Sequence, residues 1–216
     1  MYRRKTKRIM DLCIAIPSLF LTFPIIFLNG FFIFMQDGEN PFFTQLRPGK
    51  NGRIFRLIKL RTMNNRKDAN GNLLPDEIRL TYLGRIIRKT SLDELPQLFN
   101  VILGHMSLIG PRPLLPEYLN HYNAEHSKRH NVRPGITGLA QVLGRNKMKF
   151  SDRFKLDIYY VNNLSLSLDL KIIFLTLKAI FFDTASVVNG QLVEEVDDLA
   201  LSRDLKMNHK TDSYDN

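Results

Sequence analysis

The chain has 216 residues, of which 44% are hydrophobic, enough for one domain with a core and for appended segments. Its formal net charge of +10 predicts a polyanionic partner, such as a nucleic acid, an anionic membrane surface or a phosphate-rich substrate. The single cysteine, Cys13, lies in an apolar run, which excludes a disulfide framework and a cysteine-based metal site and favours a reducing, cytoplasm-facing location.

The chain begins with a basic stretch and a long apolar run. Residues 1–8 carry five Lys or Arg side chains, and residues 12–36 carry no charge. An uncharged run of this length exceeds the roughly 20 residues that cross a bilayer core. It also exceeds the apolar part of a signal peptide and lacks a small-residue cleavage site, so we expect it to be retained.

Two features argue against a straight membrane span. Cytoplasmic flanks of membrane helices are rich in Lys and Arg, and here both flanks are basic, with six such residues between positions 47 and 61. Pro24 lies near the middle of the run, with Pro17 before it, and a proline removes a backbone donor and bends a helix. We therefore favour a helix-break-helix that enters one leaflet and returns at Pro24. Thr22 or Asn29 is expected to bond the carbonyls freed there.

Two strands joined by a tight turn are predicted at residues 42–47 and 53–60. The connecting residues 48–52 contain an Asn-Gly pair, which is a strong turn signal. Lys59 and Arg61 share one face because side chains alternate along a strand. They either meet an anion or lie on a solvated strand edge.

After a polar loop at residues 63–75, a short basic helix is expected over residues 78–88. It ends about one turn before two adjacent carboxylates, Asp93 and Glu94. Arg88 is close enough in sequence to meet a phosphate that Asp93 approaches. The ordinary alternative for such an arginine is a solvated surface position.

The two carboxylates lie at the expected start of another helix. Ser91 is a suitable N-cap with Glu94 three residues later, the spacing of a capping box. Apolar residues then recur at helical spacing up to Leu103, and Gly104 is a natural stop. Pro96 is tolerated only near a helix start, so both carboxylates fall in the first turn.

A carboxylate in this position permits two interpretations. The free N–H groups of a helix N-terminus hold phosphate and keep a neighbouring carboxylate ionised, which would make Asp93 a nucleophile. Alternatively, Ser91 and Glu94 only cap the helix, and Asp93 gains from the helix dipole. Residues 91–100 alone do not decide between these two interpretations, so the rest of the chain must supply the context.

Two later loops carry an arginine in a rigid setting. Arg112 lies between two prolines, so its guanidinium loses little entropy on binding a phosphate; a rigid turn with an incidental arginine is the alternative. Arg133 opens the glycine-containing loop 133–138, and Arg145 follows another glycine. These glycines permit close backbone approach to a ligand. The sequence has no dinucleotide-binding glycine motif and no Walker A motif, so neither fold is supported.

Helices are expected at residues 114–130, 151–163 and 165–183. In the first, His126 and His130 lie one turn apart without a third ligand at suitable spacing, so we do not expect a metal site there. The third is apolar with two interrupting lysines, which suits either a membrane interface or a buried core position.

In this order, the segments resemble the small monotopic polyprenyl-phosphate phosphoglycosyl transferases of the bacterial sugar transferase family. The resemblance covers residues 1 to about 185 and includes the proline-broken apolar run. Its motifs are Lys59-Leu60-Arg61-Thr62-Met63, Ser91-Leu92-Asp93-Glu94-Leu95-Pro96-Gln97, Ile109-Gly110-Pro111-Arg112-Pro113, Arg133-Pro134-Gly135-Ile136-Thr137-Gly138 and Gly144-Arg145-Asn146. The compact size and the run Asp68-Ala69-Asn70-Gly71 bring the chain nearest to the transferases of N,N'-diacetylbacillosamine phosphate.

The resemblance implies that a UDP-sugar, N-acetylated in that subgroup, gives its sugar 1-phosphate to a polyprenyl phosphate such as undecaprenyl phosphate. UMP is released, in the first membrane step of bacterial glycoconjugate assembly. Carried over residue by residue, Asp93 is the nucleophile that forms a covalent phospho-sugar intermediate, and Glu94 is its partner. The implied phosphate contacts are Arg88, Arg112, Lys59, Arg61, Arg133 and Arg145. Mg²⁺ is the implied cofactor and Asp93 a ligand of it.

The resemblance also implies an architecture and a location. The fold is mainly helical α+β, with a re-entrant helix-break-helix at Pro24, a small β-hairpin and interfacial amphipathic helices. We expect a membrane segment at 1–36, a catalytic domain at 37–185 on the cytoplasmic face of the bacterial inner membrane, and a mobile tail at 186–216. The resemblance leaves undecided whether the protein forms a homo-oligomer. Family members often place Ser before the mid-membrane proline, whereas this chain has Phe23.

The implied chemistry is consistent with the residue types. Attack by a carboxylate on phosphorus splits one transfer into two, so that two substrates of different polarity use one site in turn. Because Asp93 and the phosphates are all anionic, cations must surround them. The competing hypothesis is a non-enzymatic module that binds a membrane surface or a nucleic acid. The sequence lacks the interleaved basic and aromatic pattern of nucleic-acid binding, so we expect no nucleic-acid partner.

Overall fold

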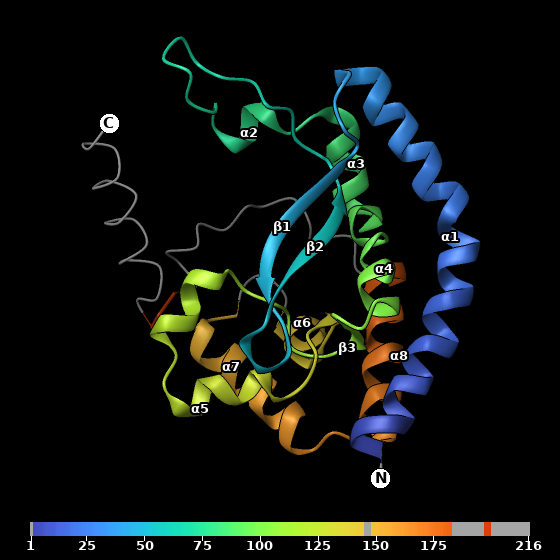
Figure 1. The fold of residues 1–216 in the computed structure, drawn as a ribbon, viewed down its shortest axis with the longest axis vertical. Coiled ribbons are helices and arrows are strands. Elements are labelled where there is room, and N and C mark those ends of the chain that lie inside the picture. The colour runs from blue at the N-terminus through green and yellow to red at the C-terminus, as the bar shows by residue number, and fades with distance from the viewer. Residues whose placement is uncertain (1, 145–147, 183–196, 200–216) are drawn as a thin grey trace.

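The computed structural model describes residues 2–144, 148–182 and 197–199. As predicted, the fold is mainly helical α+β, with a long N-terminal helix, α1 (Lys7–Asp37), beside a β-hairpin of β1 (Phe42–Pro48) and β2 (Ile54–Leu60) (Figure 1). The other helices are α2 (Asp76–Arg79), α3 (Tyr82–Lys89), α4 (Gln97–Ile102), α5 (Ala124–Ser127), α6 (Leu139–Gly144), α7 (Phe150–Asn162) and α8 (Leu166–Phe182). The other strands are β3 (Ser107–Ile109) and β4 (Gly135–Thr137), and the short turns are η1 (Tyr2–Thr6), η2 (Lys50–Gly52), η3 (Leu92–Glu94), η4 (Pro116–His121) and η5 (Lys128–Asn131).

The apolar run forms one bent helix, where a helix-break-helix was expected. Helix α1 continues through both Pro17 and Pro24, and its axis bends in the middle (Figure 1). A proline removes one backbone donor and displaces the helix axis, but the hydrogen bonds on either side of it can carry the helix on. The predicted break at Pro24 is therefore a bend.

The expected partners of the freed carbonyls lie elsewhere. Thr22 Oγ1 donates to the carbonyl of Ser18 at 2.7 Å, and Asn29 Nδ2 donates to the carbonyl of Ile25 at 2.8 Å. Neither hydrogen bond reaches Phe20, four residues before Pro24, whose carbonyl loses its helical donor. Both instead reinforce helical turns on either side of the bend.

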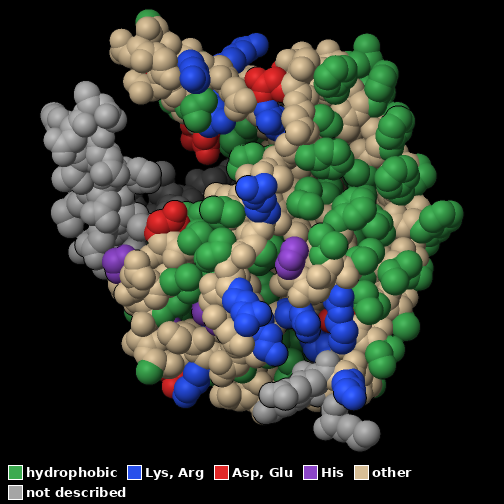
Figure 2. All heavy atoms as spheres, viewed as in Figure 1, with side chains coloured by type: hydrophobic (Ala, Val, Ile, Leu, Met, Phe, Trp, Pro, Cys, Tyr) green, Lys and Arg blue, Asp and Glu red, His purple; other side chains and the backbone are tan. Residues whose placement is uncertain are grey.

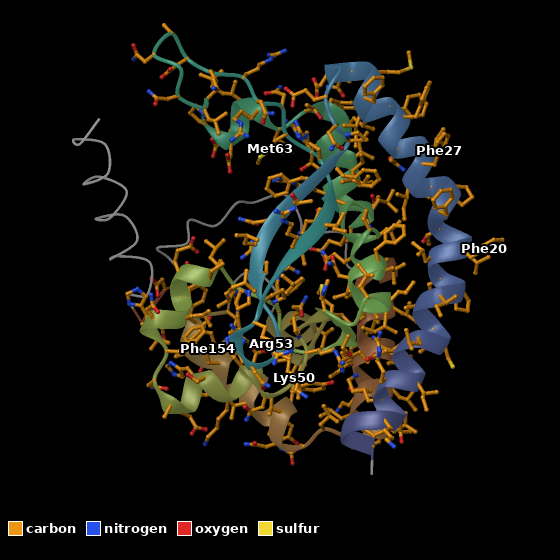
Figure 3. The ribbon with its side chains drawn as sticks, viewed as in Figure 1. Phe20, Phe27, Lys50, Arg53, Met63 and Phe154 are labelled. Atoms are coloured by element: carbon orange, nitrogen blue, oxygen red, sulfur yellow. The ribbon has the colours of Figure 1, made fainter. Side chains whose placement is uncertain are left out.

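Helix α1 exposes an apolar surface. Within the described part of the chain, it is the one helix long and apolar enough to cross a membrane. Phe20 and Phe27 are 81% and 67% exposed and project away from the rest of the protein (Figure 3). Hydrophobic side chains cover the face of the molecule along this helix (Figure 2). An apolar surface of this extent is typical of contact with lipid.

The N-terminal end of α1 is anchored by buried polar contacts. Lys7 Nζ lies 2.8 Å from Asp169 Oδ2 in α8, and Ser107 Oγ in β3 donates to Asp11 Oδ2 at 2.8 Å. Arg8 Nη1 donates to the carbonyl of Val101 at 2.6 Å, near the C-terminal end of α4. Lys7 and Arg8 thus bind within the protein, although in the sequence they belong to the basic stretch that flanks the apolar run.

The other end of α1 is tied to the same body. Glu39 pairs with Arg61 and accepts a hydrogen bond from Asn65 Nδ2 at 2.6 Å. The backbone N–H of Arg61 donates to the carbonyl of Pro41 at 2.7 Å. Both ends of the bent helix are therefore held by the domain that follows it.

The β-hairpin forms as predicted. Its antiparallel register pairs Phe42 with Leu60 and Pro48 with Ile54. Asn51 and Gly52 adopt positive φ angles of 56° and 73°, which an Asn-Gly turn provides at little steric cost. Two buried side chains of β2 pack against α4 and the residues after it; this cluster contains Phe55, Leu57, Leu98, Val101 and Met106.

Two of the predicted helices are divided. Residues 78–88 fall into α2 and α3 because Leu80 is extended and pairs with Met63, and Thr81 then caps α3 by accepting a hydrogen bond from Gly84 N at 2.9 Å. Residues 114–130 divide into η4, α5 and η5. There Asn123 is extended and caps α5 through the N–H of His126. Local caps of this kind compete with a continuous helix.

Strands β3 and β4 form a parallel pair in segments that were predicted to be loops. Three-residue strands are too short to show an alternating pattern. A Cβ atom at Gly135 would lie 2.1 Å from the backbone nitrogen of Gly110, and one at Gly138 would lie 2.2 Å from the carbonyl oxygen of Gly110. These glycines therefore permit contact between backbone segments, where the sequence analysis expected approach to a ligand.

The predicted helices at 151–163 and 165–183 are confirmed as α7 and α8 within the described residues. Ile172 of α8 is buried, whereas Phe174 and Leu177 on the same helix are exposed, so α8 covers the core with one face and presents apolar side chains with another. Most of the predicted tail, 186–216, lies outside the described residues. Of its described part, Asp198 accepts hydrogen bonds from Ser151 at the start of α7.

Candidate active site

A groove of about 1750 Å³ gathers most of the predicted site residues. Its lining comes from α1, both hairpin strands, α2, α3, η3, α4, α6, α7, α8, the strands β3 and β4, and the loop after β3. It contains six of the residues singled out in the sequence, namely Lys59, Arg61, Arg88, Asp93, Glu94 and Arg112. Segments far apart in the sequence therefore meet in one groove, which runs along one face of α1 at Ile14, Ser18 and Thr22.

The remaining predicted residues lie elsewhere. Arg133 is not among the lining residues, and its Nε donates to the carbonyl of Gly104 at 2.7 Å. Arg145 lies outside the described residues. His126 packs on the ring of Phe154, with the centroids 4.8 Å apart, and His130 Nδ1 lies 3.2 Å from the carbonyl oxygen of Gly49.

The capping box predicted at Ser91 does not form. Ser91 has φ 56° and ψ 19°, a left-handed conformation in which its side chain makes no cap, and η3 follows it. Helix α4 begins only after Pro96. Asp93 and Glu94 thus lie on a three-residue turn before α4, so they do not occupy the first turn of that helix and its dipole is not what keeps Asp93 ionised. The cations around the turn supply the positive potential instead.

Glu94 binds two cations at once. Its Oε1 lies 2.9 Å from Lys59 Nζ and 2.8 Å from Arg112 Nη2. Two ion pairs explain why this side chain does not turn back to the N–H of Ser91, since charge-assisted hydrogen bonds are the stronger ones. Burial alone would raise the pKa of Glu94, but the charges of Arg112 and Lys59 outweigh it and lower the pKa to about 2.

Asp93 is less tightly held. Its Oδ2 lies 3.9 Å from Lys59 Nζ, beyond hydrogen-bond distance, and its side chain is 14% exposed in the groove. Burial raises the pKa of Asp93 above its ordinary value, and the negative charge of Glu94 adds to this effect, while Lys59 opposes it. A carboxylate that is partly desolvated and accepts no hydrogen bond, as is true of Asp93 among the described residues, is suited to attack an electrophile.

Arg88 and Arg112 are each held in place by a hydrogen bond to another residue. Arg88 Nε donates to Thr62 Oγ1 at 2.8 Å, which orients its guanidinium at the groove. The carbonyl of Arg112 accepts from Arg129 Nη2 at 2.8 Å. Arg129 Nη2 also lies 2.7 Å from Asp157 Oδ2 in a pair with side chains only 1% and 3% exposed.

Arg129 and Asp157 also support the site, and neither was predicted from the sequence to do so. Arg129 lies in the basic run Lys128-Arg129-His130, a pattern typical of a solvated surface, and Asp157 is one of the two acidic residues of α7. Their pairing joins segments 28 residues apart and becomes visible only in the folded chain. Its effect is to set the backbone that carries Arg112.

The carboxylates of the groove are compatible with a divalent cation. Within the described ranges, no group of three or more His, Cys, Asp or Glu side chains gathers as a metal site. Mg²⁺ usually takes only one or two carboxylates and fills its remaining positions with substrate phosphates and water. With Glu94 engaged by two cations, Asp93 is the carboxylate placed to serve as such a ligand.

Comparison with known proteins gives a consistent result. Residues 2–183 match the family described as bacterial sugar transferase. The uncharacterized sugar transferase EpsL of Bacillus subtilis (strain 168) is 51% identical over 174 residues, covering 81% of this chain and 86% of EpsL.

Two relatives with named activities are longer proteins. The UDP-N-acetylgalactosamine-undecaprenyl-phosphate N-acetylgalactosaminephosphotransferase of Aeromonas hydrophila is 38% identical, over 81% of this chain. The undecaprenyl-phosphate galactose phosphotransferase of Salmonella typhimurium (strain LT2) is 36% identical, over 82% of this chain. The chain spans 43% and 40% of these two proteins.

Proposed function

Because the chain belongs to the bacterial sugar transferase family, we propose that it transfers a sugar 1-phosphate from a UDP-sugar to undecaprenyl phosphate. The products are UMP and undecaprenyl-diphospho-sugar. One observation carries the proposal: the carboxylate of Asp93, which accepts no hydrogen bond from the described residues, lies in a groove beside Lys59, Arg88 and Arg112. The two relatives with named activities support the choice of undecaprenyl phosphate as acceptor.

In the first half-reaction, Asp93 is the nucleophile. A carboxylate oxygen of Asp93 attacks the phosphorus that carries the sugar, and the bond from this phosphorus to the oxygen bridging the two phosphates breaks. The electron pair of that bond leaves with UMP, and the sugar phosphate stays on Asp93 as an acyl phosphate. Lys59, Arg88 and Arg112 offset the repulsion between the attacking carboxylate and the anionic donor.

In the second half-reaction, the lipid replaces the enzyme. A phosphate oxygen of undecaprenyl phosphate attacks the same phosphorus, and the acyl oxygen–phosphorus bond breaks. The electron pair returns to Asp93 as its carboxylate, so the enzyme is regenerated. Glu94 stays ionised throughout, because it is bound by Lys59 and Arg112, and it keeps these two cations in place.

We propose Mg²⁺ as the cofactor. When bound, it would neutralise the diphosphate of the donor, with Asp93 as its protein ligand. The identity of the sugar is a further part of the proposal. The two relatives with named activities carry N-acetylgalactosamine and galactose in their names, and the run at residues 68–71 favours an N-acetylated sugar such as N,N'-diacetylbacillosamine.

We further propose that α1 enters one leaflet of the inner membrane from its cytoplasmic face and returns. Both of its ends are tied to the same domain, one by Lys7 and Asp169 and the other by Glu39 and Arg61. The bend lies between these ends, on the side where apolar side chains project outward (Figure 3). This arrangement would bring the lipid acceptor to the groove, which α1 lines.

Cysteine labelling tests this topology. In a Cys13→Ala background, Lys5→Cys and Arg53→Cys place single thiols at exposed sites on either side of α1 in the sequence. Both are expected to react with a membrane-impermeant maleimide in inverted membrane vesicles and not in right-side-out vesicles. Labelling of the two sites from opposite sides would establish a straight span and refute the proposal.

UMP release tests the activity. Full-length protein in detergent is supplied with Mg²⁺, undecaprenyl phosphate and a panel of UDP-sugars that includes UDP-galactose, UDP-N-acetylgalactosamine and UDP-N,N'-diacetylbacillosamine. We expect UMP and a lipid-linked product with at least one donor, and no UMP release by Asp93→Asn. Release of UMP by Asp93→Asn at the wild-type rate would refute the assigned nucleophile.

A further inference from the structure

Arg153 is a cation of the groove to which the proposed reaction gives no role. It lies on α7 and lines the groove together with Arg112. Its side chain is half-buried, and its Cζ atom lies 5.1 Å from the ring centroid of Phe150, which limits its motion. Within the described part of the chain, no carboxylate pairs with its guanidinium.

The nearest acidic residue on the same helix is already engaged. Asp157 lies one turn after Arg153, on the same side of α7. Both Nε and Nη2 of Arg129 bind Asp157 Oδ2, at 3.1 Å and 2.7 Å. The negative charge of Asp157 is thus matched by a buried arginine, and Arg153 keeps its hydrogen-bonding capacity for a ligand.

The same pair places Arg153 beside Arg112. Arg129 joins Asp157 on α7 to the carbonyl of Arg112, so three hydrogen bonds connect the helix that carries Arg153 with the loop that carries Arg112. Burial lowers the pKa of Arg153, and the negative charge of Asp157 opposes this shift. The positive charges of Arg129 and Arg112 add smaller shifts in the same direction as burial, which is consistent with this proximity. Two arginines therefore lie on one wall of the groove.

The balance of charge along the groove favours a diphosphate ligand. Among the described lining residues, Arg61 pairs with Glu39, Arg79 with Asp76, and Asp157 with Arg129. The cations left over are Lys59, Arg88, Lys89, Arg112 and Arg153, and the carboxylates left over are Asp93 and Glu94. This excess of positive charge suits a ligand with two phosphate groups, and its members are spread over several elements.

We propose that Arg153, with Arg112, binds the nucleotide phosphate of the donor, which departs as UMP. This assignment rests on the proposed function. Lys59 lies within 4 Å of the nucleophile and therefore belongs with the phosphate that is attacked. The next phosphate of a donor extended along the groove would meet the wall of Arg112 and Arg153. When the bridging bond breaks, the nucleotide phosphate gains a negative charge, and a guanidinium fork there stabilises that charge.

Exchange of labelled UMP isolates the step in which Arg153 acts. Without lipid acceptor, the first half-reaction runs forward and back, so labelled UMP enters the UDP-sugar pool. The UMP concentration at half-maximal exchange is measured for wild type, Arg153→Gln and Arg153→Lys. Lys155→Gln is the matched control, since Lys155 lies on the same helix, is exposed and, among the described residues, pairs only with Asp152.

We expect Arg153→Gln to raise this UMP concentration at least about tenfold, because a charged hydrogen bond to phosphate is lost. The UMP concentration at half-maximal exchange for Arg153→Lys should lie between the values for wild type and Arg153→Gln. The value for Lys155→Gln should match that of wild type. Transfer from a preformed adduct to undecaprenyl phosphate should be unchanged in Arg153→Gln, which also shows that the variant is folded.

Two results would overturn the assignment. One is that Arg153→Gln has the same UMP concentration at half-maximal exchange as wild type. The other is that Arg153→Gln slows only the transfer to lipid, which would place Arg153 at the acceptor phosphate. Absence of exchange in the wild-type protein would instead refute the covalent step of the proposed function, and the assignment would fall with it.

Discussion

Oε1 of Glu94 lies 2.8 Å from Nη2 of Arg112. The same oxygen lies 2.9 Å from Nζ of Lys59, so a single carboxylate holds two cations from separate segments of the chain. Among the described residues, its neighbour Asp93 has one cation within 4 Å, Lys59, whose Nζ lies 3.9 Å from Asp93 Oδ2. The two adjacent carboxylates are thus divided between two tasks: Glu94 organises the positive charges, and Asp93 stays available for attack.

Replacing Glu94 tests this division. In Glu94→Gln, the negative charge that holds Lys59 and Arg112 is lost, so both cations are expected to turn toward Asp93 and reduce its nucleophilicity. We expect kcat/KM for UMP release to fall by about 100-fold or more, the size of effect seen when a preorganised electrostatic contact is removed. Initial rates at several donor concentrations provide the measurement. A fall of less than a few-fold, with the protein folded, would show that Glu94 has no such role.

The acidic limb of the pH–rate profile reports on Asp93. Asp93 must be ionised to attack, and burial raises its pKa above the ordinary value of 3.8, so activity should be lost as the pH falls through this raised pKa. Lys59 lowers the pKa of Asp93, and Lys59→Gln should therefore move the limb to higher pH. Glu94, with a pKa of about 2, does not titrate in this range. The profile of kcat/KM against pH is compared between wild type and Lys59→Gln.

Lys67→Gln is the control for this profile, because Lys67 lies in the polar loop and does not line the groove. Its limb should coincide with that of wild type. A limb in Lys59→Gln that stays in place or moves to lower pH would mean that the titrating group is not Asp93.

Asp93 is also expected to reduce stability. An acid whose pKa is higher in the folded than in the unfolded chain destabilises the fold where it is ionised, above the folded pKa, and has no effect below the unfolded pKa. Asp93→Asn should therefore melt at the same or a higher temperature than wild type near pH 8, and the difference should shrink as the pH approaches 4. Asp152→Asn, at an exposed site of α7, should show little change at either pH. A lower melting temperature for Asp93→Asn near pH 8 would contradict this account of its burial.

Gly84 sets the position of Arg88 through Thr62. A Cβ atom at Gly84 would lie 2.0 Å from the carbonyl oxygen of Thr62, so Gly84→Ala must displace the residue to which Arg88 is hydrogen-bonded. We expect loss of both thermal stability and activity. Gly30→Ala in α1 is the matched control, since its Cβ would meet Pro41 at an ordinary 3.6 Å and alanine favours a helix. Equal stability of the two variants would show that the contact of Gly84 with Thr62 is not tight.

The sequence predicted the elements whose signals are local. The Asn51-Gly52 turn identifies the hairpin, and the apolar spacing identifies α7 and α8. The resemblance to a known family singled out Lys59, Arg88, Asp93, Glu94 and Arg112, and the fold brings all of these to one groove. Their separation in sequence gives no indication of their distances, so only the structure reveals that Lys59 reaches Glu94.

Tertiary contacts account for three of the incorrect predictions, and the fourth, at Pro24, has a local cause. The capping box failed because Glu94 binds two cations outside its own turn. The helix expected over 78–88 is divided because Leu80 pairs with Met63. Strands β3 and β4 have no local pattern and depend on the close approach of Gly110 and Gly135. The break expected at Pro24 is a bend because helical hydrogen bonds continue on both sides.

Mass spectrometry of the intact protein, quenched in acid soon after mixing with Mg²⁺ and a UDP-sugar in the absence of lipid, tests the covalent role of Asp93 most directly. We predict an added mass equal to the sugar phosphate, located on Asp93 in the digested protein, removed on addition of undecaprenyl phosphate and absent from Asp93→Asn. Product formation by wild-type protein without any such adduct at any quench time, or an adduct that persists in Asp93→Asn, would contradict the mechanism.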